Sequence, residues 1–232
     1  MGLSLGLASP GAADIAAARF IEPTERYGHG VLGETSEHAA IAVTFGDGRT
    51  ATLRWDRPMV FEDVAPRLLD IDGDGARELL VVESHEDFGA RFAVYNVAGD
   101  ALVPLTRNPF IGTRFRWLAI VGAADLDGDG AIEIAYVDRP HLARTLRVWR
   151  LVPEEGGLGA RELASLTGVT NHRIGEEDIA GGLRDCGAGP EMIVADAAWD
   201  RIISVRLDGS GLTATDIGPH RGRASFAAAM GC

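Results

Sequence analysis

The stretch DIDGDGARE, residues 70–78, returns almost unchanged as DLDGDGAIE at residues 125–133. Both copies run into a short apolar segment that is typical of a β-strand, LLVVES in the first and IAYVD in the second. A third and degenerate copy, LRDCGAGPE, occupies residues 183–191 and is followed by MIVADA. The offsets between copies are 55 residues (125 − 70) and 58 residues (183 − 125). A repeat of this kind indicates an array of similar structural units.

Each unit carries four short apolar segments. One precedes the acidic turn, a second follows it, a third comes after a polar loop and a fourth after a glycine-containing turn. Short segments of this kind, separated by turn signals at regular spacing, indicate an all-β array. Four strands in a unit of about 55 residues are typical of one blade of a β-propeller.

The two ends of the chain complete the count of blades. Residues 15–56 contain three predicted strands of a blade that lacks its first strand, and RASFAAAMGC, residues 223–232, aligns with the first strands of the other units. We therefore predict one domain over residues 14–232, a four-bladed β-propeller of four-stranded antiparallel blades. Strand exchange between the termini would close it and remove exposed sheet edges. The alternatives are a β-sandwich and an open array. The predicted blades cover about residues 15–56 plus 222–232, 64–107, 119–167 and 178–217.

The acidic turns have the composition of calcium sites. An EF-hand is excluded, because its position twelve requires a bidentate Glu and these turns have Val81 and Tyr136 there. Four carboxylates in nine residues repel one another unless a cation neutralises them, and hard oxygen donors suit Ca²⁺. We expect two Ca²⁺ sites, the alternative being solvated acidic turns. The third copy, with Leu183 and Gly187 at positions one and five, is expected to bind no metal. The predicted ligands are Asp70, Asp72, Asp74, Ala76 and Glu78 in the first site, and Asp125, Asp127, Asp129, Ala131 and Glu133 in the second, with each Ala contributing its carbonyl oxygen.

The two DxDGDGxxE turns with their flanking strands, including VGAADLDGDG at residues 121–130, resemble the FG-GAP/VCBS repeats of integrin-alpha-like β-propellers. Through the blade repeat, the resemblance extends over nearly all of residues 15–232. It implies Ca²⁺ in the turns between strands one and two of a blade, in a mainly structural role. The chain is also similar to small exported FG-GAP proteins of alphaproteobacteria, which implies no particular activity. It departs from the pattern in the degenerate third copy and in the split blade, which has no acidic turn.

The sequence contains two cysteines, Cys186 and Cys232. The repeat alignment places them at the same turn position of adjacent blades, so we predict a disulfide between them. The alternative is two buried thiols. Neither cysteine lies in a CxxC or a Cys/His cluster, and a zinc site is therefore not indicated.

Charge and hydropathy exclude two classes of protein. A formal net charge of −12 and a pI near 4.9 argue against electrostatic binding of nucleic acid. No apolar run approaches the roughly 20 residues of a membrane-spanning helix. Residues 1–13 are small and apolar, and we predict that they end a secretory signal peptide whose basic region lies upstream of Met1. The alternative is a disordered tail. We expect a periplasmic or secreted monomer.

The loops opposite the acidic turns are the predicted functional face. In a propeller blade, the loops that join strands two to three and four to one share this face. All six histidines fall in these loops or at their edges: His29, His38, His85, His141, His172 and His220. The ligand-binding candidates are Arg116, Trp117, His172, Arg173, His220 and Arg223.

Two functions compete for this face. The first is a binding module for a protein partner, a glycan or an anionic small molecule, because Arg offers a planar fork to anionic groups. The second is a hydrolase or lyase that acts on a polysaccharide or small molecule, with His172 or His220 as general base and Glu62 or Glu176 as its partner. A merely solvated face is the third alternative. Binding is favoured over catalysis, because the sequence has neither a GxSxG motif nor a phosphate-binding glycine loop.

Overall fold

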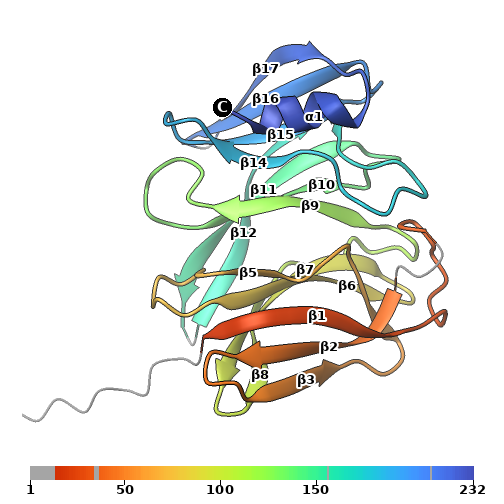
Figure 1. The fold of residues 1–232 in the computed structure, drawn as a ribbon, viewed down its shortest axis with the longest axis vertical. Coiled ribbons are helices and arrows are strands. Elements are labelled where there is room, and N and C mark those ends of the chain that lie inside the picture. Colours follow the sequence, from red (N-terminus) through yellow and green to blue (C-terminus); the bar gives the residue numbers. More distant parts are fainter. Residues whose placement is uncertain (1–13, 34–36, 156, 210) are drawn as a thin grey trace, which may run out of the picture.

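The strands form three antiparallel sheets, of eight, four and five strands, within which we distinguish four consecutive groups along the chain (Figure 1). The computed structural model describes residues 14–33, 37–155, 157–209 and 211–232. The predicted signal peptide, residues 1–13, lies outside the described residues. Within them, no helix is long and apolar enough to cross a membrane. The fold is all-β apart from one short helix.

The first two groups belong to one sheet, and the other two form a sheet each. The extra strand β4, which was not predicted, joins the first two groups by pairing with both β2 and β6. The strands of these groups are β1 (Ile15–Pro23), β2 (Glu37–Phe45), β3 (Thr50–Arg54), β4 (Met59–Glu62), β5 (Arg67–Leu69), β6 (Glu78–His85), β7 (Gly89–Ala98) and β8 (Ala101–Arg107). Those of the other two are β9 (Leu118–Ala124), β10 (Glu133–Asp138), β11 (Thr145–Glu154), β12 (Gly157–Thr167), β13 (Val169–Thr170), β14 (Gly182–Asp185), β15 (Pro190–Asp196), β16 (Arg201–Asp208) and β17 (Gly211–Pro219).

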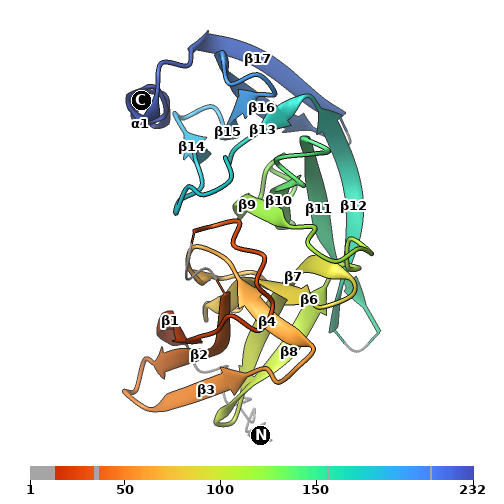
Figure 2. The same ribbon diagram turned by 90° about the vertical axis from the view of Figure 1, so that its right-hand side faces the viewer.

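The groups fan out in an arc (Figure 2), which makes the fold propeller-like. Strands β9 and β14 lie on the inner side of the arc, and β12 and β17 lie on the outer side. The predicted closure is wrong, because residues 223–230 form the helix α1 (Arg223–Met230) and not a strand. Strand β1 pairs with β2 alone, and β1 and α1 lie at opposite ends of the inner side. A fourth blade shared by the two termini is therefore absent from the described residues.

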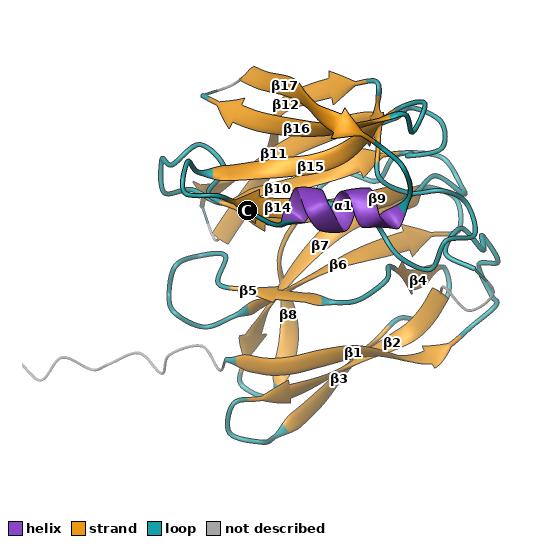
Figure 3. Cartoon of the chain, turned by 45° about the horizontal axis from the view of Figure 1, so that its top comes forward, coloured by secondary structure: helices purple, strands orange, loops and turns teal. Residues whose placement is uncertain are grey.

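Composition explains why the C-terminal segment is helical. The sequence RASFAAAM has four alanines and no β-branched residue, and alanine is the strongest helix former. The helix packs against β14, β15 and β16 (Figure 3), where Phe226 is buried beside Ile193 and Ile202. The helix therefore covers the last group of strands and pairs with no sheet edge.

The loop between β1 and β2 links the two ends of the arc. Its Tyr27, Val31 and Leu32 are buried, and the latter two join the core cluster that contains Trp117. The amide of Gly175, which belongs to the loop between β13 and β14, donates a hydrogen bond of 3.0 Å to the Val31 carbonyl. Apolar burial thus draws this loop across the fold, on the side opposite the acidic turns.

Candidate functional site

Two acidic clusters lie in the turns that join β5 to β6 and β9 to β10. In each cluster, one oxygen from each of three carboxylates lies within 4.8 Å of the others, and the clusters could hold a metal ion. The members are Asp70, Asp72 and Glu78 in the first turn, and Asp125, Asp127 and Glu133 in the second.

The aspartate at position one of each turn shapes the turn itself. The carboxylate of Asp70 accepts hydrogen bonds from the amides of Gly73 (2.8 Å) and Gly75 (3.1 Å). Both glycines have positive φ, +78° and +90°, which a residue with a Cβ rarely adopts. Asp125 accepts the equivalent bonds from its own turn. The carboxylates are therefore positioned by the backbone of the turn.

The predicted fourth carboxylates, Asp74 and Asp129, are not members of these clusters. Each accepts the amide hydrogen two residues later in its own turn, at 2.8 and 2.9 Å. The predicted roles of the Ala76 and Ala131 carbonyl oxygens as metal ligands stay predictions.

Glu78 shows that the first turn fits a cation. This residue is fully buried, and its Oε2 accepts a 2.7 Å hydrogen bond from the Ile71 amide. Its Oε1 is buried and has no hydrogen-bond partner among the described residues. The pKa of this carboxyl is raised to about 7, mainly by burial and also by the charges of the neighbouring aspartates, while the hydrogen bond from Ile71 opposes the shift. A bound cation would give Oε1 the partner that the protein does not supply.

The third turn carries Cys186, which forms a disulfide with Cys232, and the Cα atoms of the two cysteines lie 5.5 Å apart. The bridge ties the end of the chain, just beyond α1, to the turn between β14 and β15. Among the described residues, this turn contributes no cluster of metal-ligating side chains. It carries a covalent link where the first two turns carry converging carboxylates.

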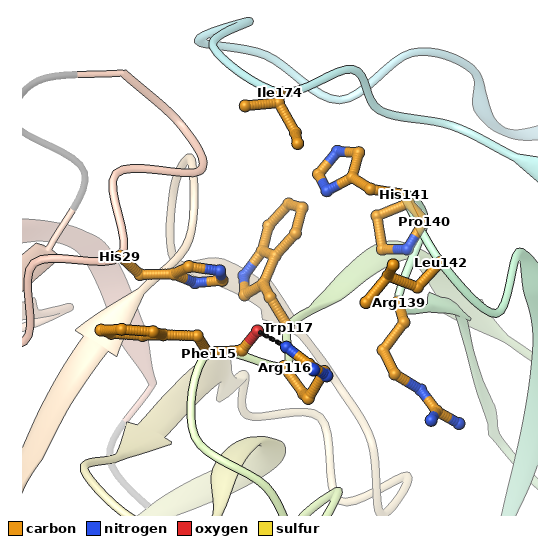
Figure 4. A pocket seen from close by; sticks show the side chains of 9 residues that line it. All are labelled: His29, Phe115, Arg116, Trp117, Arg139, Pro140, His141, Leu142 and Ile174. Carbon is orange, nitrogen blue, oxygen red and sulfur yellow. Dashed lines mark hydrogen bonds between the residues drawn. The ribbon is translucent and has the colours of Figure 1, made fainter.

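A cavity of about 280 Å³ opens on the opposite face (Figure 4). Its wall is mainly apolar, and two exposed residues, Leu142 and Ile174, stand at its edge. His29 and His141 lie on opposite sides of Trp117. The residues that line the cavity are His29, Phe115, Arg116, Trp117, Arg139, Pro140, His141, Leu142 and Ile174.

The two arginines of the cavity differ in their available charge. Arg139 binds the carboxylate of Asp138 through two hydrogen bonds of 2.8 Å, so its charge is already neutralised. Within the described ranges, the Arg116 side chain donates only to the neighbouring Phe115 carbonyl, at 3.0 Å. No carboxylate of the described chain forms a salt bridge with it. Arg116 is therefore the cation that the cavity offers to a ligand.

A chain of hydrogen bonds sets the proton positions of His141. The Glu176 carbonyl accepts from Nε2 of His172 at 2.8 Å, because a carbonyl oxygen cannot donate. Burial lowers the pKa of His172, and burial together with His172 lowers the pKa of His141 to about 4. In the neutral pair, His172 Nδ1 accepts from His141 Nε2 at 3.0 Å. The Nδ1 atom of His141 is then left as a hydrogen-bond acceptor.

His29 is held by a buried carboxylate. Its Nδ1 lies 2.6 Å from Oε1 of Glu62, which is fully buried, and Ser84 donates its hydroxyl to the other oxygen of Glu62. Burial raises the pKa of Glu62, while its hydrogen bonds to His29 and Ser84 oppose the shift. The ring of His29 stacks on Phe115, with centroids 5.1 Å apart. His29 therefore has a fixed orientation at the cavity wall.

The structure brings together only part of the predicted ligand-binding set. Arg116 and Trp117 line the cavity, and the buried His172 lies behind it against His141. The other three candidates lie elsewhere. Arg173 covers the ring of Trp199, His220 packs on Trp199 and Phe226, and Arg223 pairs with Asp178 and Glu176.

The His–carboxylate pairs proposed for catalysis do not form. His172 meets the backbone carbonyl of Glu176 and not its carboxylate, and His220 meets the backbone carbonyl of Trp199. Glu62 instead partners His29, a pairing that the sequence did not indicate. The buried apolar residues in the loop between β1 and β2 are the signal that it folds inward and carries His29 with it.

One comparison with known proteins concerns the region of the two acidic turns. Residues 70–136 match a family model described as an FG-GAP-like repeat. The match spans both acidic clusters and the strands β6 to β9 between them. A search of curated proteins found no match.

Proposed function

We propose, from the FG-GAP-type repeat at residues 70–136, that this chain is a Ca²⁺-stabilised, propeller-like binding module that takes a small carboxylate ligand in the loop-face cavity. The observation that carries the proposal is the cavity itself, which combines apolar walls with the guanidinium of Arg116, a group that forms no salt bridge with the described residues. Concave sites with a few convergent polar groups are the usual sites of small ligands. A periplasmic or secreted location is part of the proposal, because stable disulfides belong to oxidising compartments.

The cavity indicates the chemistry of the ligand. Phe115, Leu142 and Ile174 offer contact to an apolar ring or ring face. The planar fork of Arg116 suits a carboxylate. Nδ1 of His141 accepts a hydrogen bond and so suits a hydroxyl group. A sugar acid or a hydroxylated aromatic acid has all three features, and about 280 Å³ accommodates one such ring.

Calcium is the cation that we propose for the acidic turns. All of the candidate ligand atoms are oxygens, and carboxylate oxygens favour Ca²⁺ over metals that prefer thiolate or imidazole. The bound ion would neutralise the carboxylates and hold the turns of the repeat, while the opposite face binds the ligand. Ca²⁺ would supply electrostatic stabilisation and takes no part in ligand contact.

A thermal-shift screen of the purified protein against sugar acids and hydroxylated aromatic acids tests the cavity. We expect at least one carboxylate to raise the melting temperature, and its uncharged amide to be inactive. Arg116→Gln should weaken that ligand by roughly tenfold or more, because a hydrogen bond to a charged group contributes about 1.5–3 kcal/mol. Arg161→Gln, at an exposed position of β12, is the matched control and should bind as the wild type does. Equal affinity of the Arg116 variant and the wild type would reject this site.

Base-assisted hydrolysis or elimination is a second candidate, favoured by the 2.6 Å contact between His29 and Glu62 at the cavity wall. A buried carboxylate that orients an imidazole is a general-base arrangement. We would incubate the protein with every compound that raises its melting temperature and look for new products by mass spectrometry. Turnover that His29→Asn abolishes while binding persists would support catalysis. The absence of products with all ligands would leave binding as the function.

A further inference from the structure

The two acidic turns are nearly identical in sequence, but the strand that faces each of them differs. Glu133 begins β10 and pairs across the sheet with Arg150 of β11. Glu78 begins β6, where the next residue, Leu79, pairs with Tyr95 of β7. The antiparallel register therefore puts Asn96 across from Glu78. One turn faces a cationic residue and the other faces a neutral one.

Arg150 forms salt bridges with three of the four carboxylates of the second turn. Its three guanidinium nitrogens lie 2.6 Å from Asp127, from Asp129 and from Oε1 of Glu133. The Oε2 atom of Glu133 accepts from the Leu126 amide at 2.9 Å. Both oxygens of this buried glutamate are therefore satisfied by the protein.

The first turn repeats this geometry without the guanidinium. Oε2 of Glu78 accepts from the Ile71 amide, as Oε2 of Glu133 does from Leu126. The Oε1 atom of Glu78 corresponds to the atom that Arg150 binds, but it is buried and has no partner in the part of the chain that the structure describes. Asn96 does not supply one: its side-chain oxygen accepts from the Val97 amide, and its NH2 group makes no hydrogen bond to Oε1 of Glu78. The first turn therefore lacks a positive charge where the second has one.

In the third turn, arginine again stands across from the glutamate at position nine of the repeat. Glu191 lies opposite Arg206, which binds it at 2.6 Å, and Arg184 binds its other oxygen at 2.6 Å. This turn has lost the acidic residues at positions one and five, where Leu183 and Gly187 stand. Guanidinium groups thus satisfy the glutamate in a turn that has no carboxylate cluster.

We propose that Arg150 occupies the place of the cation in the second turn, so that the protein binds one Ca²⁺ tightly, at residues 70–78. A guanidinium fork bound to three carboxylates supplies the positive charge that a metal ion would bring. A dication entering the same cluster meets repulsion from Arg150 and has to displace it. This inference refines the proposed Ca²⁺ binding, on which it rests, and is independent of the cavity.

Isothermal titration of the chelator-treated full chain with Ca²⁺ tests the inference. We expect one tight equivalent for the wild type and two for Arg150→Asn, which copies the first turn. Arg150→Gln is a second variant in case the first one folds poorly. Arg150→Lys is the matched control that keeps a positive charge, and it should bind its second equivalent at least about tenfold more weakly than Arg150→Asn does. Asn96→Arg should weaken Ca²⁺ binding at the tight site of the wild type by a similar factor. Glu78→Gln should also weaken this tight equivalent, which would assign it to residues 70–78.

The outcomes separate this inference from the proposed function. Two equivalents of equal affinity in the wild type would overturn the role of Arg150 and leave Ca²⁺ binding intact. No gain of an equivalent in either neutral variant would also overturn it. Binding by Arg150→Asn but not by the wild type would support the role of Arg150 and contradict Ca²⁺ binding at residues 70–78.

Discussion

Breaking the disulfide between Cys186 and Cys232 is expected to lower the free energy of unfolding by about 2–4 kcal/mol. The bridge spans a separation of 46 residues and restricts the unfolded chain, for which the chain-entropy model gives about 4 kcal/mol. Helix α1 is short, and Phe226 is its buried side chain, so few contacts hold it once the bridge is lost. For a chain of this size the melting temperature should fall by roughly 5–15 °C.

The measurement is denaturant unfolding of the wild type and of the double variant Cys186→Ser, Cys232→Ser. Adding a thiol reductant should bring the wild type to the stability of the variant, and the variant itself should not respond. Hydrogen exchange should show the largest loss of protection in α1, because it is the element that the bridge anchors. Identical unfolding midpoints with and without reductant would contradict the stabilising role of the bridge.

Gly89→Ala is expected to lower the free energy of unfolding by about 3–4 kcal/mol and to weaken ligand binding in the cavity. Gly89 begins β7 with φ +71°. A Cβ here would overlap the carbonyl oxygen of Thr113 and lie 2.7 Å from that of Arg116. Backbone groups cannot rotate away, so the segment that carries Phe115 and Arg116 into the cavity has to move. One methyl group would therefore affect stability and binding together.

Gly99→Ala is the matched control. Gly99 also has positive φ, +63°, in the turn between β7 and β8, but no atom lies within 4 Å of its added Cβ. Its substitution carries only the backbone penalty of about 1–2 kcal/mol and should leave the cavity unchanged. Denaturant unfolding and the affinity for a ligand from the thermal-shift screen are the two measurements. Equal losses in the two variants would show that the contacts of Gly89 with the Thr113 and Arg116 carbonyls have no effect.

Most of the strands could be predicted because their signals are local. Alternating or continuous apolar runs between turn residues placed β1, β2 and β3, and the repeat placed the strands around each acidic turn. The short strands β4 and β13 were missed, because two to four residues carry too little periodicity. The C-terminal segment was assigned from its place in the repeat, although its alanine-rich composition favours a helix.

The sequence by itself determined the repeated β units, the acidic turns with their glycines and the two cysteines, because each depends on residue type at short spacing. Only the tertiary structure decided the conformation and position of the C-terminal segment, which arginine binds which carboxylate, and which loop residues share the cavity. His29 meets Glu62, and His141 meets His172, across separations of 33 and 31 residues. Such pairs depend on how buried side chains draw loops together, and no local pattern records that packing.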